Sequence, residues 1–314
     1  MSDICSRCGL PGKHESESDC ISALVKKNKL LAKTVAKFKS EERLNDLTGA
    51  EWLFSTNTWW DTNYPMDPSH KLRSKLGSVK PPGVGAELTR AFTQKKHIVV
   101  DTFVGTGGLL LGADIEGRTS LGCELNPEMI EVIERVRDGF GFKDGNVVTR
   151  AEADRGITMN VECSSCLDWM RSMEHSSVHF VMTDPPYGIA HKKKSFKDEN
   201  NFSLDELEPD SGWGKLATIE EFLESMQVWA SEARRILKNN RYVAVFMSDR
   251  YMSGRYINLG ARVQDALEDG GLVPKAVRVW RNKSSESRLR PYAIGSAYVP
   301  NIKHQYVLIH RRED

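Results

Sequence analysis

The five residues Asp184-Pro185-Pro186-Tyr187-Gly188 have the composition of a pocket for an amino group on a flat ring. The two prolines remove two backbone donors and fix the chain, which leaves carbonyl oxygens available as acceptors beside the Asp184 carboxylate. Tyr187 adds an aromatic face on which a base can stack. The segment follows the apolar residues 178–183, so the alternative is a proline turn that only ends a buried strand.

Such a pocket could activate an exocyclic amine for methyl transfer. The lone pair of this nitrogen is normally delocalised into the ring, which makes the nitrogen a poor nucleophile. Hydrogen bonds from its two N–H groups to Asp184 and to the Pro185 carbonyl would favour a tetrahedral nitrogen, whose lone pair could attack a sulfonium methyl group in line. We therefore predict that the catalytic residues are Asp184, Pro185, Pro186 and Tyr187.

A glycine-rich turn, Asp101–Gly108, predicts a second part of the site. It follows an apolar strand segment and opens a helical one, and glycines at such a turn allow positive φ and a close approach to a ligand. Turns of this kind lie at the carboxyl edge of an α/β sheet, where ligands bind. The spacing is not G-x-G-x-x-G and there is no Walker lysine, which weakens the dinucleotide and nucleoside-triphosphate interpretations.

Glu124 ends the next apolar segment, 23 residues after Asp101. An acidic residue at a second strand end can accept hydrogen bonds from both ribose hydroxyls of a nucleoside. The alternative is a carboxylate that caps the following helix. Together with the glycine-rich turn, Glu124 favours a cofactor that carries a nucleoside.

Strand-like and helix-like segments alternate around these residues, which predicts a doubly wound α/β sheet. The strand-like segments are 97–101, 119–124, 178–183, 242–247, 276–280 and 305–309, and the helix-like segments are 107–116, 128–138, 218–237 and 261–269. Thr218 and Glu221 have capping-box spacing, and Pro127 stands where a first helical turn begins.

The N-terminal region contains a candidate zinc site made of Cys5, Cys8, His14 and Cys20. One histidine and three cysteines can close a tetrahedral, structural site with a layout similar to a zinc knuckle. The last two gaps are each one residue longer than the usual spacing, and the alternative is a disordered tail with incidental cysteines. We interpret the pair Cys163 and Cys166 as buried thiols.

Three segments are expected along the chain: a zinc knuckle at 1–22, a helical linker at 23–48 with a lysine-rich face, and the catalytic domain at 49–314. The absence of an apolar signal core or membrane-length run predicts a protein of the cytoplasm, nucleoid or nucleus, with reduced cysteines.

The net charge of +1, from 44 basic and 43 acidic residues, excludes a polycation that coats nucleic acid by charge alone. Any nucleic-acid contact must come from local basic patches. The candidates are 191–197 and 281–290, and the alternative for each is a solvated loop.

The Asp101–Gly107 turn, Glu124 and Asp184–Tyr187, in this order, resemble the DNA amino-methyltransferases, the adenine-N6 and cytosine-N4 enzymes. The resemblance covers residues 70–310. It implies a Rossmann-like class I methyltransferase sheet, S-adenosylmethionine as cofactor and double-stranded DNA as substrate, in DNA methylation or restriction–modification. Asp at the first position of the catalytic motif favours adenine N6.

Carried over residue by residue, the resemblance implies a cofactor site around the glycine-rich turn. Its expected members are Lys80, Asp101, Phe103, Gly105, Gly107, Glu124, Asn126 and Ser165. The family often has an acid at the position of Ser165, where it contacts the cofactor adenine, and a hydroxyl is a weaker partner than a carboxylate. No long target-recognition domain is evident.

Two other functions fit parts of the pattern. Residues 102–108 with Asp184–Gly188 also resemble the tRNA guanine-N2 methyltransferases, although no RNA-binding domain of their usual type is found. A zinc-bearing nucleic-acid-binding protein with an inactive methyltransferase fold is the alternative from another class. The intact Asp184–Tyr187 segment argues against it.

Overall fold

The computed structural model describes residues 43–76, 79–186, 218–252, 254–284 and 298–314. The chain divides into two compact units, 1–57 and 58–314. In the first unit, the described residues contain helix α3 (Gly49–Ser55), which opens with a capping box between Thr48 and Glu51. The predicted zinc knuckle and residues 23–42 of the predicted linker lie outside the described residues. The second unit carries the predicted catalytic and cofactor segments.

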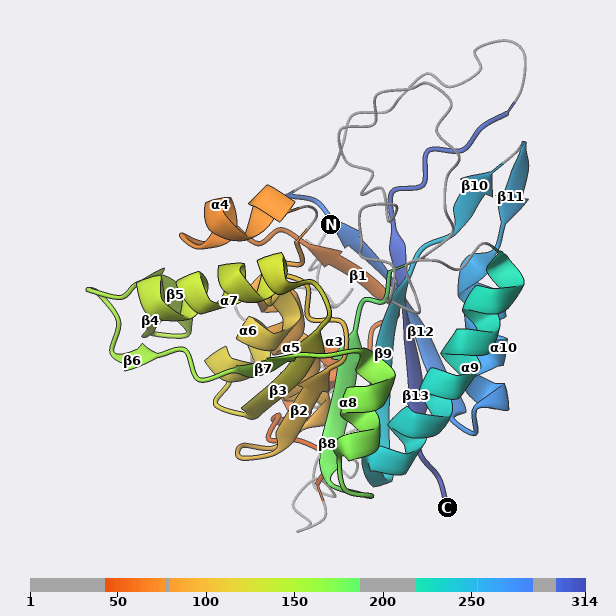
Figure 1. The fold of residues 1–314 in the computed structure, drawn as a ribbon, viewed down its shortest axis with the longest axis horizontal. Helices are drawn as coiled ribbons and strands as arrows, with labels where there is room; N and C mark the ends of the chain where they lie inside the picture. Colours follow the sequence, from red (N-terminus) through yellow and green to blue (C-terminus); the bar gives the residue numbers. More distant parts are fainter. Residues whose placement is uncertain (1–42, 77–78, 187–217, 253, 285–297) are drawn as a thin grey trace, which may run out of the picture. The chain divides into compact units, whose positions relative to one another are not determined.

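A mostly parallel sheet forms the centre of the second unit (Figure 1), which confirms the predicted α/β class. The strand order is β1-β12-β13-β9-β8-β2-β3-β7. Strand β13 runs antiparallel to both of its neighbours, and the other pairs are parallel. The strands are β1 (Trp59–Thr62), β2 (Ile98–Asp101), β3 (Thr119–Glu124), β7 (Asn160–Cys163), β8 (Val178–Thr183), β9 (Leu237–Met247), β12 (Val273–Asn282) and β13 (Gln305–Arg311).

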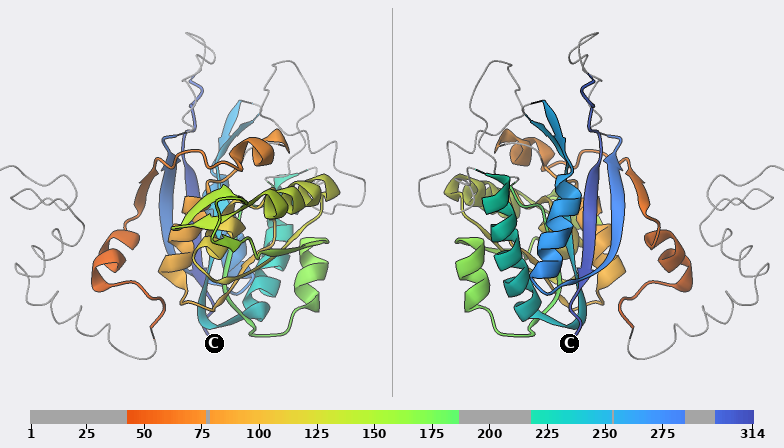
Figure 2. Two further views of the ribbon diagram at one scale, coloured as in Figure 1. Left: turned by 90° about the vertical axis from the view of Figure 1, so that its left-hand side faces the viewer. Right: turned by 90° about the vertical axis from the view of Figure 1, so that its right-hand side faces the viewer.

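Helices cover both faces of this sheet (Figures 1 and 2). One face carries α5 (Pro82–Phe92), α6 (Gly108–Ile115) and α7 (Pro127–Gly139), and the other carries α8 (Cys166–Ser172), α9 (Ile219–Ile236) and α10 (Leu259–Asp269). Two short helical turns, α4 (His70–Arg73) and η1 (Ser74–Leu76), precede α5.

The predicted helix boundaries have identifiable causes. Thr218 and Glu221 form the predicted capping box of α9. Asn126 caps α7, whose first residue is Pro127. Helix α10 ends before Gly270, as the sequence indicated.

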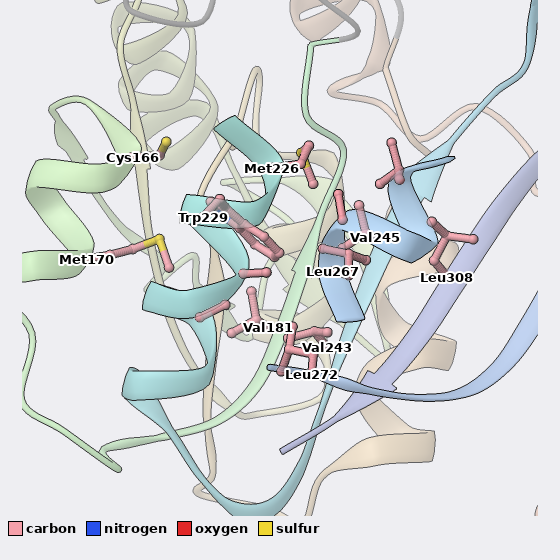
Figure 3. Close-up of a cluster of buried hydrophobic side chains, with 14 of the residues drawn as sticks. Cys166, Met170, Val181, Met226, Trp229, Val243, Val245, Leu267, Leu272 and Leu308 are labelled. Atoms are coloured by element: carbon pink, nitrogen blue, oxygen red, sulfur yellow. The ribbon is translucent and has the colours of Figure 1, made fainter. Parts of the chain in front are cut away.

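The main core lies between the sheet and helices α8, α9 and α10 (Figure 3). Helix α9 has a strong apolar stripe. Its apolar residues recur at helical spacing, so they lie on the one face of the helix that packs against the sheet. This stripe contains Phe222, Met226, Trp229, Ala230 and Ala233. It packs against alternate residues of β8 and β9, including Val181, Val243 and Val245. Both strands are fully buried over 180–182 and 243–247, and the sequence of these stretches is continuously apolar.

Helices α5 and α6 pack closely through glycines. A Cβ atom added to Gly85 would lie 2.1 Å from the Leu109 carbonyl oxygen, and one added to Gly112 would lie 2.3 Å from the Ala86 nitrogen. Larger residues would therefore separate the two helices. This contact matters for the site because α6 begins at the glycine-rich turn and α5 begins just after Lys80.

Two smaller sheets flank the main one. Strands β4 (Phe140–Lys143), β5 (Asn146–Thr149) and β6 (Arg155–Gly156) form the first, in the order β5-β4-β6. Strands β10 (Arg250–Met252) and β11 (Arg255–Ile257) form a hairpin just after β9. Among the described helices, none has the length and apolar character needed to cross a bilayer.

Candidate active site

Three carboxylates lie at one edge of the sheet, where β8, β2 and β3 end. These strands are neighbours and run parallel, so their carboxyl ends meet. Asp184 follows β8 directly, Asp101 is the last residue of β2, and Glu124 is the last residue of β3. The structure thus brings together three acidic residues that the sequence placed at three separate strand ends.

The glycine-rich turn lies between Asp101 and α6. Gly105 and Gly107 have φ values of 55° and 88°, in the left-handed region that favours glycine. A Cβ atom on Gly105 would meet no heavy atom within 4 Å. The turn therefore combines a conformation that needs glycine with open space in the described structure above Gly105, as the prediction of a close ligand approach requires.

Glu124 holds this turn in place through both carboxylate oxygens. Its Oε2 accepts a hydrogen bond from the Gly105 amide at 2.7 Å, and its Oε1 accepts one from the Asn126 amide at 2.9 Å. Burial raises the pKa of Glu124, and these amides oppose the rise. The side chain that caps α7 is that of Asn126, which accepts from the Glu128 amide, so the capping alternative for Glu124 does not describe this site.

Asp101 is almost fully buried. Burial raises its pKa from 3.8 to about 7, and the neighbouring carboxylates of Asp184 and Glu124 add to the rise. Hydrogen bonds from the Phe103 amide at 3.0 Å and from the Thr183 hydroxyl at 2.8 Å oppose it. Asp101 therefore changes its charge close to neutral pH, far from the range of an ordinary carboxyl group.

A buried chain of hydroxyl groups connects the glycine-rich turn to the catalytic segment. Thr183 donates to Asp101, and its oxygen lies 3.3 Å from that of Thr102. The indole of Trp229 donates to Thr102 at 3.0 Å. Thr183 and Trp229 had no predicted role, and Thr102 was predicted only as part of the glycine-rich turn. Thr183 directly precedes Asp184, which is the available signal, whereas Trp229 has the spacing of an ordinary core residue.

The Asp184 carboxylate forms an ion pair with Lys80. The ammonium of Lys80 also lies 5.0 Å from the ring centroid of Phe246 and 5.5 Å from that of Trp280. The resemblance implied that Lys80 belongs to the cofactor site, and the structure places its side chain on the catalytic segment. Pro185 is buried and Pro186 is partly buried.

Two of the predicted site residues have other observed roles, and a third, Tyr187, lies outside the described residues. Ser165 caps α8: its hydroxyl accepts from the Asp168 amide at 3.3 Å and donates to the Asp168 carboxylate at 2.7 Å. Asn126 caps α7, and only its backbone amide reaches Glu124.

The predicted zinc ligands Cys5, Cys8, His14 and Cys20 lie outside the described residues. Within the described ranges, no group of three or more His, Cys, Asp or Glu side chains could hold a metal ion. The interpretation of Cys163 as a buried thiol was wrong. Cys163 is exposed because it ends the edge strand β7, whereas Cys166 is the first residue of α8 and is buried in the main core.

Comparison with known proteins gives a family match over most of the chain. The sequence model of the DNA methylase family matches residues 16–135 and 178–313. These ranges include the glycine-rich turn, Glu124 and the catalytic segment. Residues 136–177, which contain β4 to β7 and α8, lie outside the match.

Individual relatives match shorter segments. The tRNA (guanine(10)-N(2))-methyltransferase TRMT11 from Dictyostelium discoideum is 30% identical over 141 residues, which cover 44% of this chain and 23% of that protein. The Type II methyltransferase M.HpaI from Haemophilus parainfluenzae is 26% identical over 94 residues, 30% of this chain and 24% of that protein. A SAM-dependent methyltransferase structure from Methanosarcina mazei has a TM-score of 0.43 and 13% identity, over 70% of this chain and 94% of that one. The matched segments thus span a minor part of the two relatives compared by sequence.

Proposed function

Since this chain belongs to the DNA methylase family, we propose that it transfers a methyl group from S-adenosylmethionine to an exocyclic amine of a DNA base, with adenine N6 favoured over cytosine N4. The observation that carries the proposal is the position of Asp184 and the two prolines. They leave the end of buried strand β8, directly beside the strand that ends in the glycine-rich turn. A substrate pocket and a cofactor pocket would then share one edge of the sheet.

The residues around the glycine-rich turn fit the cofactor by the chemistry of their groups. Glu124 has acceptor oxygens suited to ribose hydroxyls, and each oxygen can accept a further hydrogen bond beyond the amide it already holds. The open space at Gly105 allows the methionine part to approach the backbone. The carboxyl group of Asp101 would lie close to the ammonium group of the bound methionine part. When bound, the cofactor supplies an electrophilic methyl group on a sulfonium.

The residues of the catalytic segment would act on the amine. The Asp184 carboxylate and the Pro185 carbonyl would accept hydrogen bonds from the two N–H groups of the target amine. These hydrogen bonds would favour a tetrahedral nitrogen. The carboxylate would also stabilise the positive charge that develops on this nitrogen as the new N–C bond forms and the methyl–sulfur bond breaks. The methylated nitrogen would then lose one proton to solvent, and the thioether would leave with the rest of the cofactor. Tyr187 would stack on the base. In duplex DNA these contacts require the base to leave the helix, because an amine in the stack cannot reach such a pocket.

A second substrate class is supported by the relative from Dictyostelium, whose name describes methylation of N2 of a tRNA guanine. Guanine N2 is also an exocyclic amine, so the same pocket could serve it. DNA remains our proposal because the family match covers both the cofactor and catalytic segments.

We also propose that Cys5, Cys8, His14 and Cys20 bind one structural zinc ion. Four protein ligands leave no open position for a catalytic water. The proposed methyl transfer needs no metal, because the amine itself is the nucleophile. The zinc unit would support the N-terminal region and leave the chemical step to the second unit.

The experiment that tests the function uses purified protein with tritium-labelled S-adenosylmethionine. Duplex DNA and total tRNA are offered separately, and the methylated nucleosides are identified by mass spectrometry. Label in N6-methyladenine or N4-methylcytosine from DNA supports the proposal. Label in N2-methylguanine from tRNA alone would transfer the protein to the second class. No transfer to either polymer, by protein that binds the cofactor, would overturn the methyltransferase assignment.

A further inference from the structure

We propose that the Lys80 ammonium occupies the position of the substrate amine in the free protein, and that only a base with an amino group displaces it. This inference rests on the proposed function and deepens it, because it assigns a specificity-determining role to Lys80. The juxtaposition that carries it is an ammonium on Asp184 above two aromatic rings.

The chemical likeness between the two nitrogens is close. An ammonium is a tetrahedral, positively charged nitrogen that donates to the Asp184 carboxylate. The target amine acquires the same geometry and charge as it accepts a methyl group. Asp184 thus already holds, in the Lys80 ammonium, the kind of nitrogen that the transition state would present.

The aromatic rings add a second likeness. The rings of Phe246 and Trp280 meet edge to face, with centroids 5.5 Å apart and an interplanar angle of 80°. Cations are attracted to aromatic faces at the distances observed for Lys80. The side chain of Lys80 is only 12% exposed, so it fills the space between these rings and Asp184. When it leaves, an aromatic surface beside a carboxylate becomes available.

The backbone of Lys80 is fixed, so the displacement must be a side-chain motion. The buried Arg73 donates to the Lys80 carbonyl at 3.4 Å and is itself held by Asp67 at 2.6 Å and Ser69 at 2.9 Å. A Cβ atom added to Gly108 would lie 2.2 Å from the same carbonyl oxygen, so the start of α6 also packs against this backbone. The flexible stem of lysine can swing while this anchor stays in place.

The displacement would discriminate between bases. An exocyclic amine offers two N–H donors to replace the ammonium on Asp184. A carbonyl at the same position, as in thymine, offers none and would face a carboxylate. The free protein would therefore keep Asp184 paired until a suitable donor arrives.

The test compares Lys80→Met with Lys80→Arg in steady-state transfer to the polymer that the wild type methylates. Lys80→Met removes the competing charge, so KM for the polymer should fall about tenfold, the size expected when a charge-assisted hydrogen bond no longer has to be broken. Lys80→Arg keeps a cation and should keep the high KM. Lys275→Met is the control for loss of one positive charge, because Lys275 pairs with Glu313 and not with Asp184.

Other outcomes would overturn the inference. A raised dissociation constant for S-adenosylmethionine in Lys80→Met, measured by calorimetry, would return Lys80 to the cofactor site. A loss of kcat at unchanged KM would mean that Lys80 only orients the carboxylate. An active wild type with unchanged kinetics in Lys80→Met would remove this inference alone, whereas an inactive wild type would remove the proposed function and the inference with it.

Discussion

Carboxylates in this site differ because their surroundings differ. Asp101 is closed off from solvent and has its pKa raised to about 7, whereas Asp184 is partly exposed and paired with Lys80. Glu124 lies between these cases, partly buried and held by two amides. The same chemical group therefore differs in exposure and in hydrogen-bond partners at these three positions.

Asp184→Asn tests the residue with the most specific assignment. The amide keeps the shape of the side chain but loses the charge that would stabilise a cationic nitrogen, so kcat should fall by about a hundredfold or more. Calorimetry should show cofactor affinity within a few-fold of the wild type. Asp144→Asn, in the turn between β4 and β5, is the matched control. A mutant with near-normal turnover would remove Asp184 from the chemistry.

The positions of the three carboxylates at the sheet edge could be predicted from the sequence, whereas their hydrogen-bond and ion-pair partners could not. Asp101, Glu124 and Asp184 could be found because each follows an apolar strand segment. The pairing of Lys80 with Asp184 joins positions 104 residues apart and depends on packing that no local pattern shows. The same holds for Trp229, whose indole bonds to Thr102 across 127 residues.

At the scale of elements, strong periodicity determined which segments could be predicted. Continuous apolar runs occupy 98–100 in β2, 180–182 in β8 and 243–247 in β9, and α9 has a clear stripe and a capping box. Strands β10 and β11 have three residues each, and β6 has two, so they lack enough sequence for a period. Their formation depends on tertiary contacts.

The contact between α5 and α6 gives an element-scale prediction. Gly85→Ala would place a methyl group against the Leu109 carbonyl and force the helices apart, with a loss of about 1–3 kcal/mol or more in the free energy of unfolding. Gly139→Ala is the control, because a Cβ there meets nothing within 4 Å and Gly139 ends α7. Urea unfolding of both variants checks this, and equal stabilities would mean that α5 and α6 can move apart without cost.

At the scale of the whole molecule, stability should depend on pH through buried groups. Asp101 has a folded pKa of about 7 against 3.8 when unperturbed. Between about pH 4 and 7 the folded state holds a proton that the unfolded state has released, so this group's contribution is lost as pH rises, by at most about 1.4 kcal/mol per pH unit. His179 and His310, whose pKa values burial lowers to about 4, act in the opposite direction.

Asp101→Asn isolates the carboxyl contribution from that of the histidines. The variant cannot lose the proton, so its stability relative to the wild type should rise from pH 5 to pH 8. Urea unfolding of both proteins at several pH values gives this difference directly. A difference that is independent of pH would show that Asp101 titrates normally in the folded protein.

The proposed zinc site concerns the N-terminal region, and it is tested on the whole protein. Elemental analysis of protein purified without chelator should find one zinc per chain, and Cys5→Ser should reduce that content. Cys163→Ser is the matched control, because Cys163 is an exposed thiol on β7. Removal of residues 1–22 should leave cofactor binding intact. Zinc-free wild-type protein, or zinc that depends on Cys163, would contradict the proposal.

The antiparallel strand β13 has a consequence for synthesis of the protein. It lies between β9 and β12, and β1 joins the sheet only through β12. Strand β1 is synthesised before the other strands of this sheet. It can join the sheet only after residues 305–311 have emerged from the ribosome, more than 240 residues later. The strands that carry Asp101, Glu124 and Asp184 are all made before that moment. The nascent chain can therefore bring these three carboxylates together early, while Trp280 on β12 joins the sheet only after β13 has emerged.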